Sequence, residues 1–250
     1  MSAVMIGSAR IDERGRARGG QAGDQGGKEV SLQAWYRHAK GWVLLRCVDP
    51  AMRGYIGDAM EAACKNEKIG YDQGQRLTLY NQVKDKGFDP AKAAAACETD
   101  CSALVRVCVL YAFGKCGIAQ GVPNFTTGNQ VSALVGTGHF EKLTAPEYTA
   151  KPGALTRGDI LVTRVRGHTV VVVRARPTLR YGAAGETVRR MQTLLLRADP
   201  ASLQVYGADG QFGGETRRAL RRFQKKAGLR AMGICGPRTW EALERAGKEG

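Results

Sequence analysis

The sequence predicts an α+β domain followed by a small helical module. Apolar residues recur at helical spacing between residues 50 and 113, and short β-rich segments separated by Gly and Pro follow between residues 139 and 173. Helical spacing returns beyond residue 184. The chain has 250 residues, 43% of them hydrophobic, which suffices for one or two packed cores.

The N-terminal elements are predicted from turn residues and apolar spacing. The first thirty residues are rich in Gly and charge and indicate loops, whereas the apolar run inside residues 30–47 predicts a strand. Helical spacing predicts helices over residues 50–65 and 75–86. Pro90 is typical of a first helical position and predicts a short helix over residues 91–97.

The segment from residue 101 to 113 predicts a buried helix. Its apolar positions fall at i, i+3, i+4, i+7, i+8 and i+11, namely Cys101, Leu104, Val105, Cys108, Val109 and Ala112. The opposite side is also apolar except for Arg106. We therefore expect burial almost all round.

Strand signals follow at residues 139–143, 158–163 and 169–173, so the first domain is predicted to span residues 1–176. A stretch without apolar periodicity predicts a linker at 177–184 and a helical domain at 185–247, with helices over 185–196 and 215–226. Residues 209–216 and 232–239 form a short internal repeat, in which glycine turns precede a helix start.

The charge balance points to an anionic partner. Lys and Arg number 38 against 23 Asp and Glu, a net charge of +15, which suits nucleic acid, a membrane surface or a wall polymer. The basic stripe at helical spacing is not interleaved with aromatic or amide side chains for base contact, so we expect no nucleic-acid partner. The stripe consists of Arg218, Arg221, Arg222 and Lys225.

Several site classes are disfavoured by composition. No stretch approaches the roughly 18 apolar residues of a membrane span, and the apolar opening lacks the basic flank of an export signal. We expect neither membrane insertion nor an export signal. Seven cysteines without a CxxC pair, beside three histidines, predict neither a disulfide framework nor a zinc cluster. No metal or cofactor is expected.

Cys101 is the candidate nucleophile because it begins the buried helix. A free thiol has a pKa of about 8.5, and a helix N-terminus lowers it by about one unit, an effect that neighbouring Asp100 opposes. A second activator is needed, and an imidazole both lowers the thiol pKa and supplies a proton. His168 leads into a rigid four-valine strand, on which a base can be held in place. For His38 and His139, a purely structural role is an alternative.

These residues resemble the NlpC-type papain-like cell-wall cysteine peptidases. The resemblance rests on Asp100-Cys101-Ser102, on the Gly158-Asp159 turn and on Gly167-His168-Thr169, in that order. Residues 23–25, 69–73 and 97–102 further resemble the catalytic domains of phage and prophage endolysins.

The resemblance implies a papain-like fold that hydrolyses an amide of the peptidoglycan stem peptide, between D-Glu and the diamino acid. It implies that Cys101 attacks the carbonyl, with His168 as base and then acid. It also implies that Asp100, Ser102 and Tyr71 line a pocket for the free amine and D-Glu of the substrate. Tyr80 competes for the role of the tyrosine. The family further implies synthesis in the host cytoplasm and action on the wall after release.

A third polar residue usually follows the histidine in this family, but the valines here lead into Arg174-Ala175-Arg176. Either the enzyme works as a dyad or the residue that orients the histidine comes from elsewhere. The candidates are Asp24, Gln25, Asp72, Gln73 and Glu98.

The tail resembles the three-helix peptidoglycan-binding module of wall hydrolases. The resemblance rests on Gly207-Ala208-Asp209-Gly210, Phe212-Gly213 and the helix residues that follow, and it implies that Asp209, Phe212 and Trp240 bind the wall. The second turn has Met232-Gly233 where the family often has Asp-Gly. Two alternatives stay open: an N-acetylmuramoyl-L-alanine amidase on the same scaffold, and a wall-binding protein without catalysis. The sequence carries no indication of oligomeric state.

Overall fold

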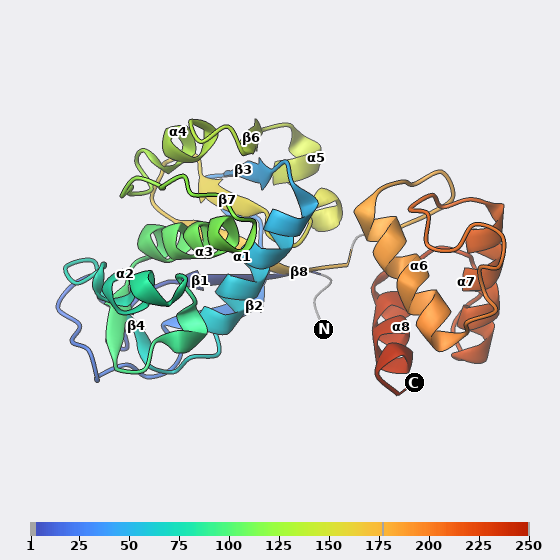
Figure 1. The fold of residues 1–250 in the computed structure, drawn as a ribbon, viewed down its shortest axis with the longest axis horizontal. Coiled ribbons are helices and arrows are strands. Elements are labelled where there is room, and N and C mark those ends of the chain that lie inside the picture. Colours follow the sequence, from blue (N-terminus) through green and yellow to red (C-terminus); the bar gives the residue numbers. More distant parts are fainter. Residues whose placement is uncertain (1–3, 177, 250) are drawn as a thin grey trace. The chain divides into compact units, whose positions relative to one another are not determined.

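The computed structural model describes residues 4–176 and 178–249. The chain divides into two compact units, the first ending at residue 175 and the second beginning at residue 176 (Figure 1). Residue 177, the first of the predicted linker, lies outside the described residues. The rest of that segment joins the second unit through two isolated β-bridges, Leu179 to Cys235 and Ala184 to Gln211.

Six strands of the first unit form one antiparallel sheet in the order β2, β1, β8, β7, β3, β6. The strands are β1 (Val4–Ala9), β2 (Val30–Ala34), β3 (Trp42–Cys47), β6 (Phe140–Leu143), β7 (Ile160–Thr163) and β8 (Thr169–Ala175). The sheet therefore combines the C-terminal strands with three from the N-terminal part. Strand β1 occupies a segment in which the sequence indicated loops.

Two long helices cover one face of this sheet and lie side by side (Figure 1). They are α1 (Pro50–Ala63), capped by the Asp49 carboxylate, and α3 (Cys101–Lys115). Eleven of the fifteen residues of α3 are buried, which confirms the expected burial all round. Helix α3 packs with Val171 and Val173 of β8 in the larger core.

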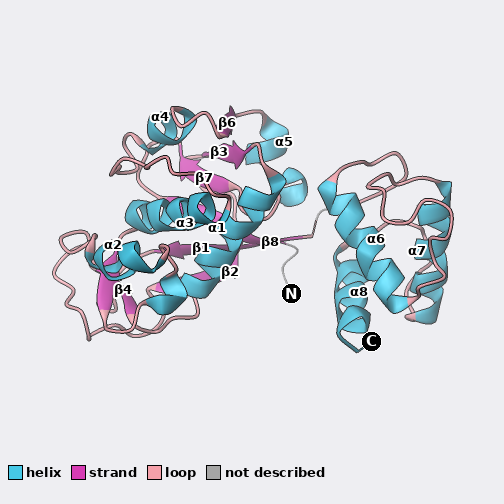
Figure 2. Cartoon of the chain, viewed as in Figure 1, coloured by secondary structure: helices cyan, strands magenta, loops and turns pink. Residues whose placement is uncertain are grey.

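Shorter elements complete the first unit (Figure 2). The helices are α2 (Thr78–Val83), α4 (Gln130–Val135) and α5 (Pro146–Thr149), with 3₁₀ turns η1 (Lys84–Lys86), η2 (Pro90–Lys92) and η3 (Pro152–Ala154). A second sheet pairs β4 (Ile69–Tyr71) with β5 (Cys97–Thr99) in parallel.

The predicted helix over residues 91–97 is wrong. Pro90 starts only one 3₁₀ turn, which Asp89 caps through the backbone N–H of Ala91 at 3.0 Å. The chain then extends into β5 because Cys97 and Glu98 pair with β4. Alanine favours a helix, but the tertiary pairing of β5 overrides that local preference.

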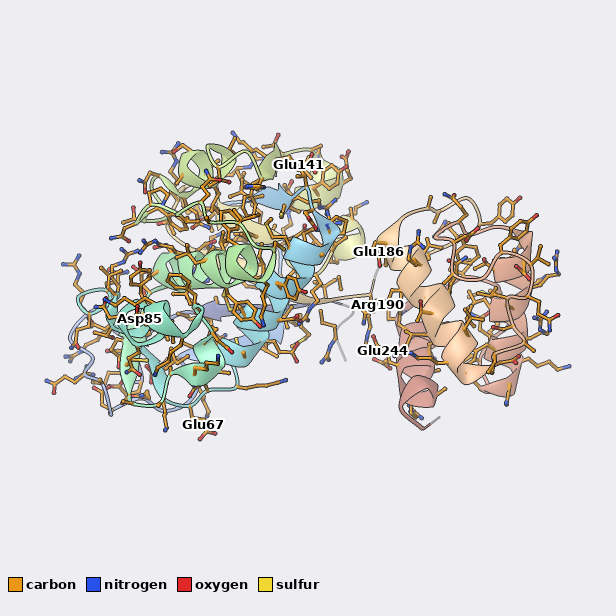
Figure 3. All side chains as sticks on the ribbon, in the orientation of Figure 1. Glu67, Asp85, Glu141, Glu186, Arg190 and Glu244 are labelled. Atoms are coloured by element: carbon orange, nitrogen blue, oxygen red, sulfur yellow. The ribbon has the colours of Figure 1, made fainter. Side chains whose placement is uncertain are left out.

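The second unit is a three-helix module built on α6 (Glu186–Ala198), α7 (Gly214–Lys226) and α8 (Pro237–Glu249). Phe212 and Trp240 are fully buried in its core. On the surface, Arg190 of α6 and Glu244 of α8 point toward each other and form an ion pair of 2.9 Å (Figure 3). The structure confirms a mixed helix and sheet domain followed by a helical module.

The internal repeat of the sequence corresponds to a repeated hydrogen-bond network. In the first copy, the Gln192 amide accepts from the backbone N–H of Gly210 at 2.8 Å and donates to Thr216 Oγ1 at 3.0 Å. In the second copy, Gln224 accepts from Gly233 at 2.9 Å and donates to Thr239 Oγ1 at 3.0 Å. Each buried glutamine thus ties one glycine turn to the helix that follows it.

Candidate functional site

Cys101 is the first residue of α3 and follows directly from β5. Asp100 is extended, with φ −111° and ψ 175°, and its Oδ1 accepts from the backbone N–H of Ala103 at 2.7 Å. This N-cap satisfies one of the unpaired donors at the helix start. The junction of β5 and α3 therefore fixes the position of the sulfur.

The Cys101 sulfur is held as a neutral thiol. Burial, and then the neighbouring Asp100 carboxylate, raise the pKa of Cys101 to about 12. The backbone N–H groups of Thr169 and Ser102 donate toward the sulfur, and the Arg76 guanidinium also lowers the pKa, but these effects are smaller. The resting site is thus not a thiolate and imidazolium pair, and a base must remove the proton during the reaction.

We expect Cys101 to react slowly with iodoacetamide at pH 7, because a thiol of pKa about 12 is ionised in only about one molecule in 10⁵ at that pH. The alkylation rate, measured by peptide mass mapping, should rise tenfold per pH unit up to at least pH 10. Cys116, at the other end of α3 and partly exposed, serves as the internal comparison. A plateau in the Cys101 rate below pH 9 would contradict the buried thiol.

The structure brings Tyr71, Asp100 and Ser102 together with Cys101. Burial raises the pKa of the Tyr71 phenol to about 12, and both Cys101 and Asp100 lie near enough to act on its ionisation. Ser102 Oγ donates to Asp100 Oδ1 at 2.8 Å. These residues come from the end of β4 and the start of α3, which the parallel pairing of β4 with β5 places together.

Arg76, which no motif in the sequence singles out, completes this group. Its Nε donates to Asp100 Oδ2 at 2.5 Å, and its Nη2 donates to Ser102 Oγ at 2.9 Å. A third bond reaches the carbonyl of Phe125 at 2.7 Å. We call the side chains of Tyr71, Arg76, Asp100, Cys101 and Ser102 the Cys101 cluster.

Thr169, at the start of β8, faces α3. Its hydroxyl accepts from Gln130 Nε2 of α4 at 3.0 Å, and Val171 and Val173 pack with α3 in the larger core. Because side chains alternate along a strand, the residues before and after Thr169 belong to the other face of the sheet. Val170 is indeed in the core of that other face.

His168 therefore lies on the face of the sheet opposite to α3. The backbone N–H of Thr163 donates to the His168 carbonyl at 2.9 Å, which pairs these two residues across β7 and β8. Thr163 pairs in turn with Trp42, a residue of the far core, and paired residues share a face. The expected contact between the His168 ring and the Cys101 sulfur is thus not made, although both residues are described.

The surroundings of His168 are cationic and aromatic. Burial, and then the charges of His38 and Arg10, lower the pKa of His168 to about 4. His38 itself lies against Trp42, with ring centroids 5.1 Å apart. His168 is therefore neutral at pH 7, the form that accepts a proton.

Four of the candidate third residues have structural partners. Asp24 accepts from the backbone of Gln21, and Gln25 donates to the carbonyl of Lys68. Gln73 Nε2 donates to the Tyr71 hydroxyl at 3.0 Å, and Asp72 accepts from Gly20 and Gln75. Each of the four is thus engaged in a hydrogen bond with another residue of the first unit.

The fifth candidate, Glu98, belongs to a buried pair of carboxyl groups. It is 0% exposed, and neither of its carboxyl oxygens has a hydrogen-bond partner among the described residues. Glu98 pairs with Gly70 of β4. A side chain at position 70 would collide with the carboxyl groups of Glu98 and Glu29, so glycine at this position lets the two carboxyl groups approach each other. Burial and then the Glu29 charge raise the pKa of Glu98 to about 8.

This raised pKa predicts a loss of stability with rising pH. Glu98 keeps its proton in the folded chain up to about pH 8 but loses it near pH 4.5 when unfolded. Stability should therefore fall between those values, by up to about 1.4 kcal/mol per pH unit. Glu98→Gln should remove this slope in denaturant titrations across pH 5–8, whereas Glu67→Gln, at an exposed glutamate, should not. An unchanged slope in Glu98→Gln would contradict the prediction.

The wall-binding roles expected for Phe212 and Trp240 are corrected by burial. Trp240 is 0% exposed and Phe212 is 2% exposed, so both stabilise the core of the helical module. Asp209 Oδ1 accepts from Gln192 Nε2 at 2.8 Å and from the backbone of Gln211, which fixes the first glycine turn. Asp209 is partly exposed, so its expected contact with the wall stays a prediction.

No group of three or more His, Cys, Asp or Glu residues within the described ranges is arranged to hold a metal ion. All seven cysteines are free thiols. None of the helices in residues 4–176 and 178–249 has the length and apolar character needed to cross a membrane.

Comparison with known families divides the chain in the same way. A model described as an endolysin-like domain matches residues 6–177, and one described as a putative peptidoglycan binding domain matches residues 184–243.

Three curated relatives match short segments. A probable N-acetylmuramoyl-L-alanine amidase of Bacillus licheniformis is 48% identical over 68 residues, or 27% of this chain and 19% of the relative. The N-acetylmuramoyl-L-alanine amidase CwlL of the same species is 45% identical over 28% of this chain and 19% of its own. A zinc D-Ala-D-Ala carboxypeptidase of Streptomyces albus G is 41% identical over 26% of each chain. This chain thus covers about a fifth of each amidase.

Proposed function

The chain belongs to the endolysin-like domain family, and from this premise we propose that it hydrolyses an amide bond of bacterial peptidoglycan. The peptidoglycan-binding domain at residues 184–243 supports the same polymer as its partner. The observation that carries the proposal is the Cys101 cluster, in which a buried thiol begins a helix beside a tyrosine and three further polar side chains.

In the proposed reaction, the Cys101 sulfur attacks the carbonyl carbon of the amide while its proton passes to a base. The C–N bond then breaks, the leaving amine takes the proton, and water releases the acyl group from the thioester. The positive end of α3 favours the negative charge that develops on the carbonyl oxygen. The raised pKa of Cys101 makes the base essential.

His168 is the proposed base, in a rearranged state of the turn between β7 and β8. The N–H of Thr169 donates toward the sulfur, so His168 adjoins Cys101 along the backbone even though its ring lies on the other face. The turn contains Arg166 with φ +60°, a sparsely populated conformation, followed by Gly167. A change in the backbone conformation of this turn would move the His168 ring to the face of the sheet that α3 covers.

Two bonds are candidates for cleavage. The bond between muramic acid and L-Ala is favoured by the names of two relatives, although these match only a fifth of each amidase. A relative named as a carboxypeptidase matches over a similar length, so the matched segment does not by itself select the bond. The bond between D-Glu and the diamino acid, which the resemblance to NlpC-type peptidases implies, is the second candidate.

Labelling the amines that appear on digested sacculi tests the proposal. An amidase exposes the amine of L-Ala, and the endopeptidase exposes the amine of the diamino acid. Mass analysis of labelled fragments therefore identifies the bond. If soluble fragments appear without a new amine, amide hydrolysis is ruled out.

Wall binding should depend on salt. Residues 177–250 carry 14 Lys and Arg against 7 Asp and Glu, and the basic stripe of α7 is exposed. Charge attraction to anionic wall polymers is screened by salt, so retention on sacculi should fall at least about tenfold between 50 and 500 mM NaCl. Arg218→Gln with Lys225→Gln should reduce that salt dependence. Equal retention at both salt concentrations would contradict a role for this charge.

A further inference from the structure

The Asp100 carboxylate accepts four hydrogen bonds and is paired with an arginine. Its Oδ1 accepts from the backbone N–H of Ala103 at 2.7 Å, from Ser102 Oγ at 2.8 Å and from Arg76 Nη2 at 3.3 Å. Its Oδ2 accepts from Arg76 Nε at 2.5 Å. Three donors thus share Oδ1 and one reaches Oδ2, and the two bonds from Arg76 pair the carboxylate with a guanidinium.

The Arg76 side chain is held in place by two acceptors in addition to Asp100 and Ser102. Its Nη2 also donates to the Phe125 carbonyl at 2.7 Å, and its Nη1 donates to Asn124 Oδ1 at 2.9 Å. The side chains of Arg76 and Asp100 are only 16% and 10% exposed. Because the pair is buried and held from several elements, an incoming cation cannot displace the guanidinium without leaving it unpaired.

The other acidic groups nearby are buried as well. Asp72 is 2% exposed and accepts from Gly20 and Gln75, and Glu98 is fully buried against Glu29. Cys101 is a neutral thiol, and burial raises the pKa of Tyr71 to about 12, so the phenol is neutral as well. The Cys101 cluster therefore offers no net negative charge to an ammonium group.

We propose that Arg76 sets the substrate specificity of the Cys101 cluster: it admits stem peptides whose L-Ala nitrogen is acylated and rejects those with a free ammonium group. The proposal rests on the proposed function, because it assumes that stem peptides bind here. It assigns Asp100 to holding Arg76 and capping α3, and not to binding the substrate amine. The site thus selects intact stems still attached to muramic acid over peptides already released from it.

Isothermal titration of the full chain carrying Cys101→Ala tests this inference without turnover. The probes are L-Ala-D-isoglutamine and its N-acetyl derivative, which differ only in the charge and acylation of one nitrogen. We expect the N-acetyl form to bind at least about tenfold more tightly at pH 7. In Arg76→Gln, which frees the carboxylate of Asp100, we expect the free-amine form to gain at least about tenfold relative to the N-acetyl form.

Two controls separate specificity from structural damage. Arg106→Gln removes a partly buried arginine that stacks on Tyr80 and bonds to the Val122 carbonyl, and it should leave the ratio of the two affinities unchanged. Arg76→Lys keeps the positive charge and should keep the preference for the N-acetyl form.

A pH titration tests the same point even if Arg76→Gln does not fold. An α-amino group loses its proton near pH 8. The free-amine probe should therefore bind more tightly at pH 9 than at pH 7 to the Cys101→Ala chain in which Arg76 is unchanged. Weaker binding at pH 9, or equal affinity for the two probes at pH 7, would overturn the inference while leaving the proposed function standing. Failure of both probes to bind at any pH would overturn the proposed substrate together with the inference.

Discussion

Cys101→Ala is expected to lower the rate of peptidoglycan hydrolysis at least about 1000-fold, because it removes the atom that attacks the carbonyl. The substitution deletes one sulfur at the start of α3 and leaves the cap made by Asp100 in place. Folding and wall binding should therefore persist. Release of soluble fragments from purified sacculi measures the first effect, and cosedimentation with sacculi measures the second.

Cys116→Ala is the matched control, because Cys116 lies at the other end of the same helix and is likewise a free thiol. It should retain hydrolysis close to that of the unsubstituted chain. If Cys101→Ala still hydrolysed sacculi at a comparable rate, Cys101 would be removed from the mechanism and only the wall-binding role of the chain would remain.

The same assay decides the role of His168. His168→Ala should lose activity to a similar extent as Cys101→Ala, whereas His38→Ala, at the histidine beside Trp42, should not. Full activity in His168→Ala would place the base elsewhere and would agree with the separation of the two faces of the sheet.

The sequence could predict the start of α3 because two local signals coincide there. Asp100 is a good N-cap, and the apolar spacing from Cys101 onward defines a buried helix. The neighbours Ser102 and Tyr71 were found only through the resemblance to a family. Arg76 had no local signal, since it reaches Asp100 from 24 positions away and looked like any other of the 38 basic residues.

The face on which His168 lies could not be predicted from sequence. Alternating apolar and polar residues would reveal the buried face of a strand, but all four valines from Val170 to Val173 are at most 1% exposed. A strand buried on both faces carries no such alternation. The strand itself is therefore predictable, whereas the direction of the His168 side chain, just before the strand, depends on the register with β7.

The Gly158-Asp159 motif is part of the family resemblance, and the structure shows that both residues have a structural role. Gly158 has φ +84°, and a side chain there would collide with the backbone of Arg53. Asp159 is 0% exposed and accepts from Arg46 Nε at 2.9 Å and Arg46 Nη2 at 2.6 Å. It also accepts from the backbone N–H of Thr156 at 2.8 Å.

Asp159→Ala should therefore destabilise the chain by about 3–5 kcal/mol, because it leaves the largely buried guanidinium of Arg46 without its charge partner. The Arg46 side chain is only 15% exposed, so water cannot replace the lost carboxylate in full. Denaturant titration monitored by circular dichroism measures the change. The free energy of unfolding should fall, and its dependence on denaturant concentration should stay the same.

Asp58→Ala is the control that separates burial from charge. Asp58 also pairs with an arginine, Arg157, at 2.6 Å, but its side chain is 53% exposed. An exposed pair contributes about 0–1 kcal/mol, so this variant should be nearly as stable as the unsubstituted chain. Similar losses in the two variants would mean that ion pairing as such stabilises the unit. A large loss confined to Asp159→Ala would instead assign the effect to the uncompensated charge of Arg46, which is largely buried whereas Asp58 is not.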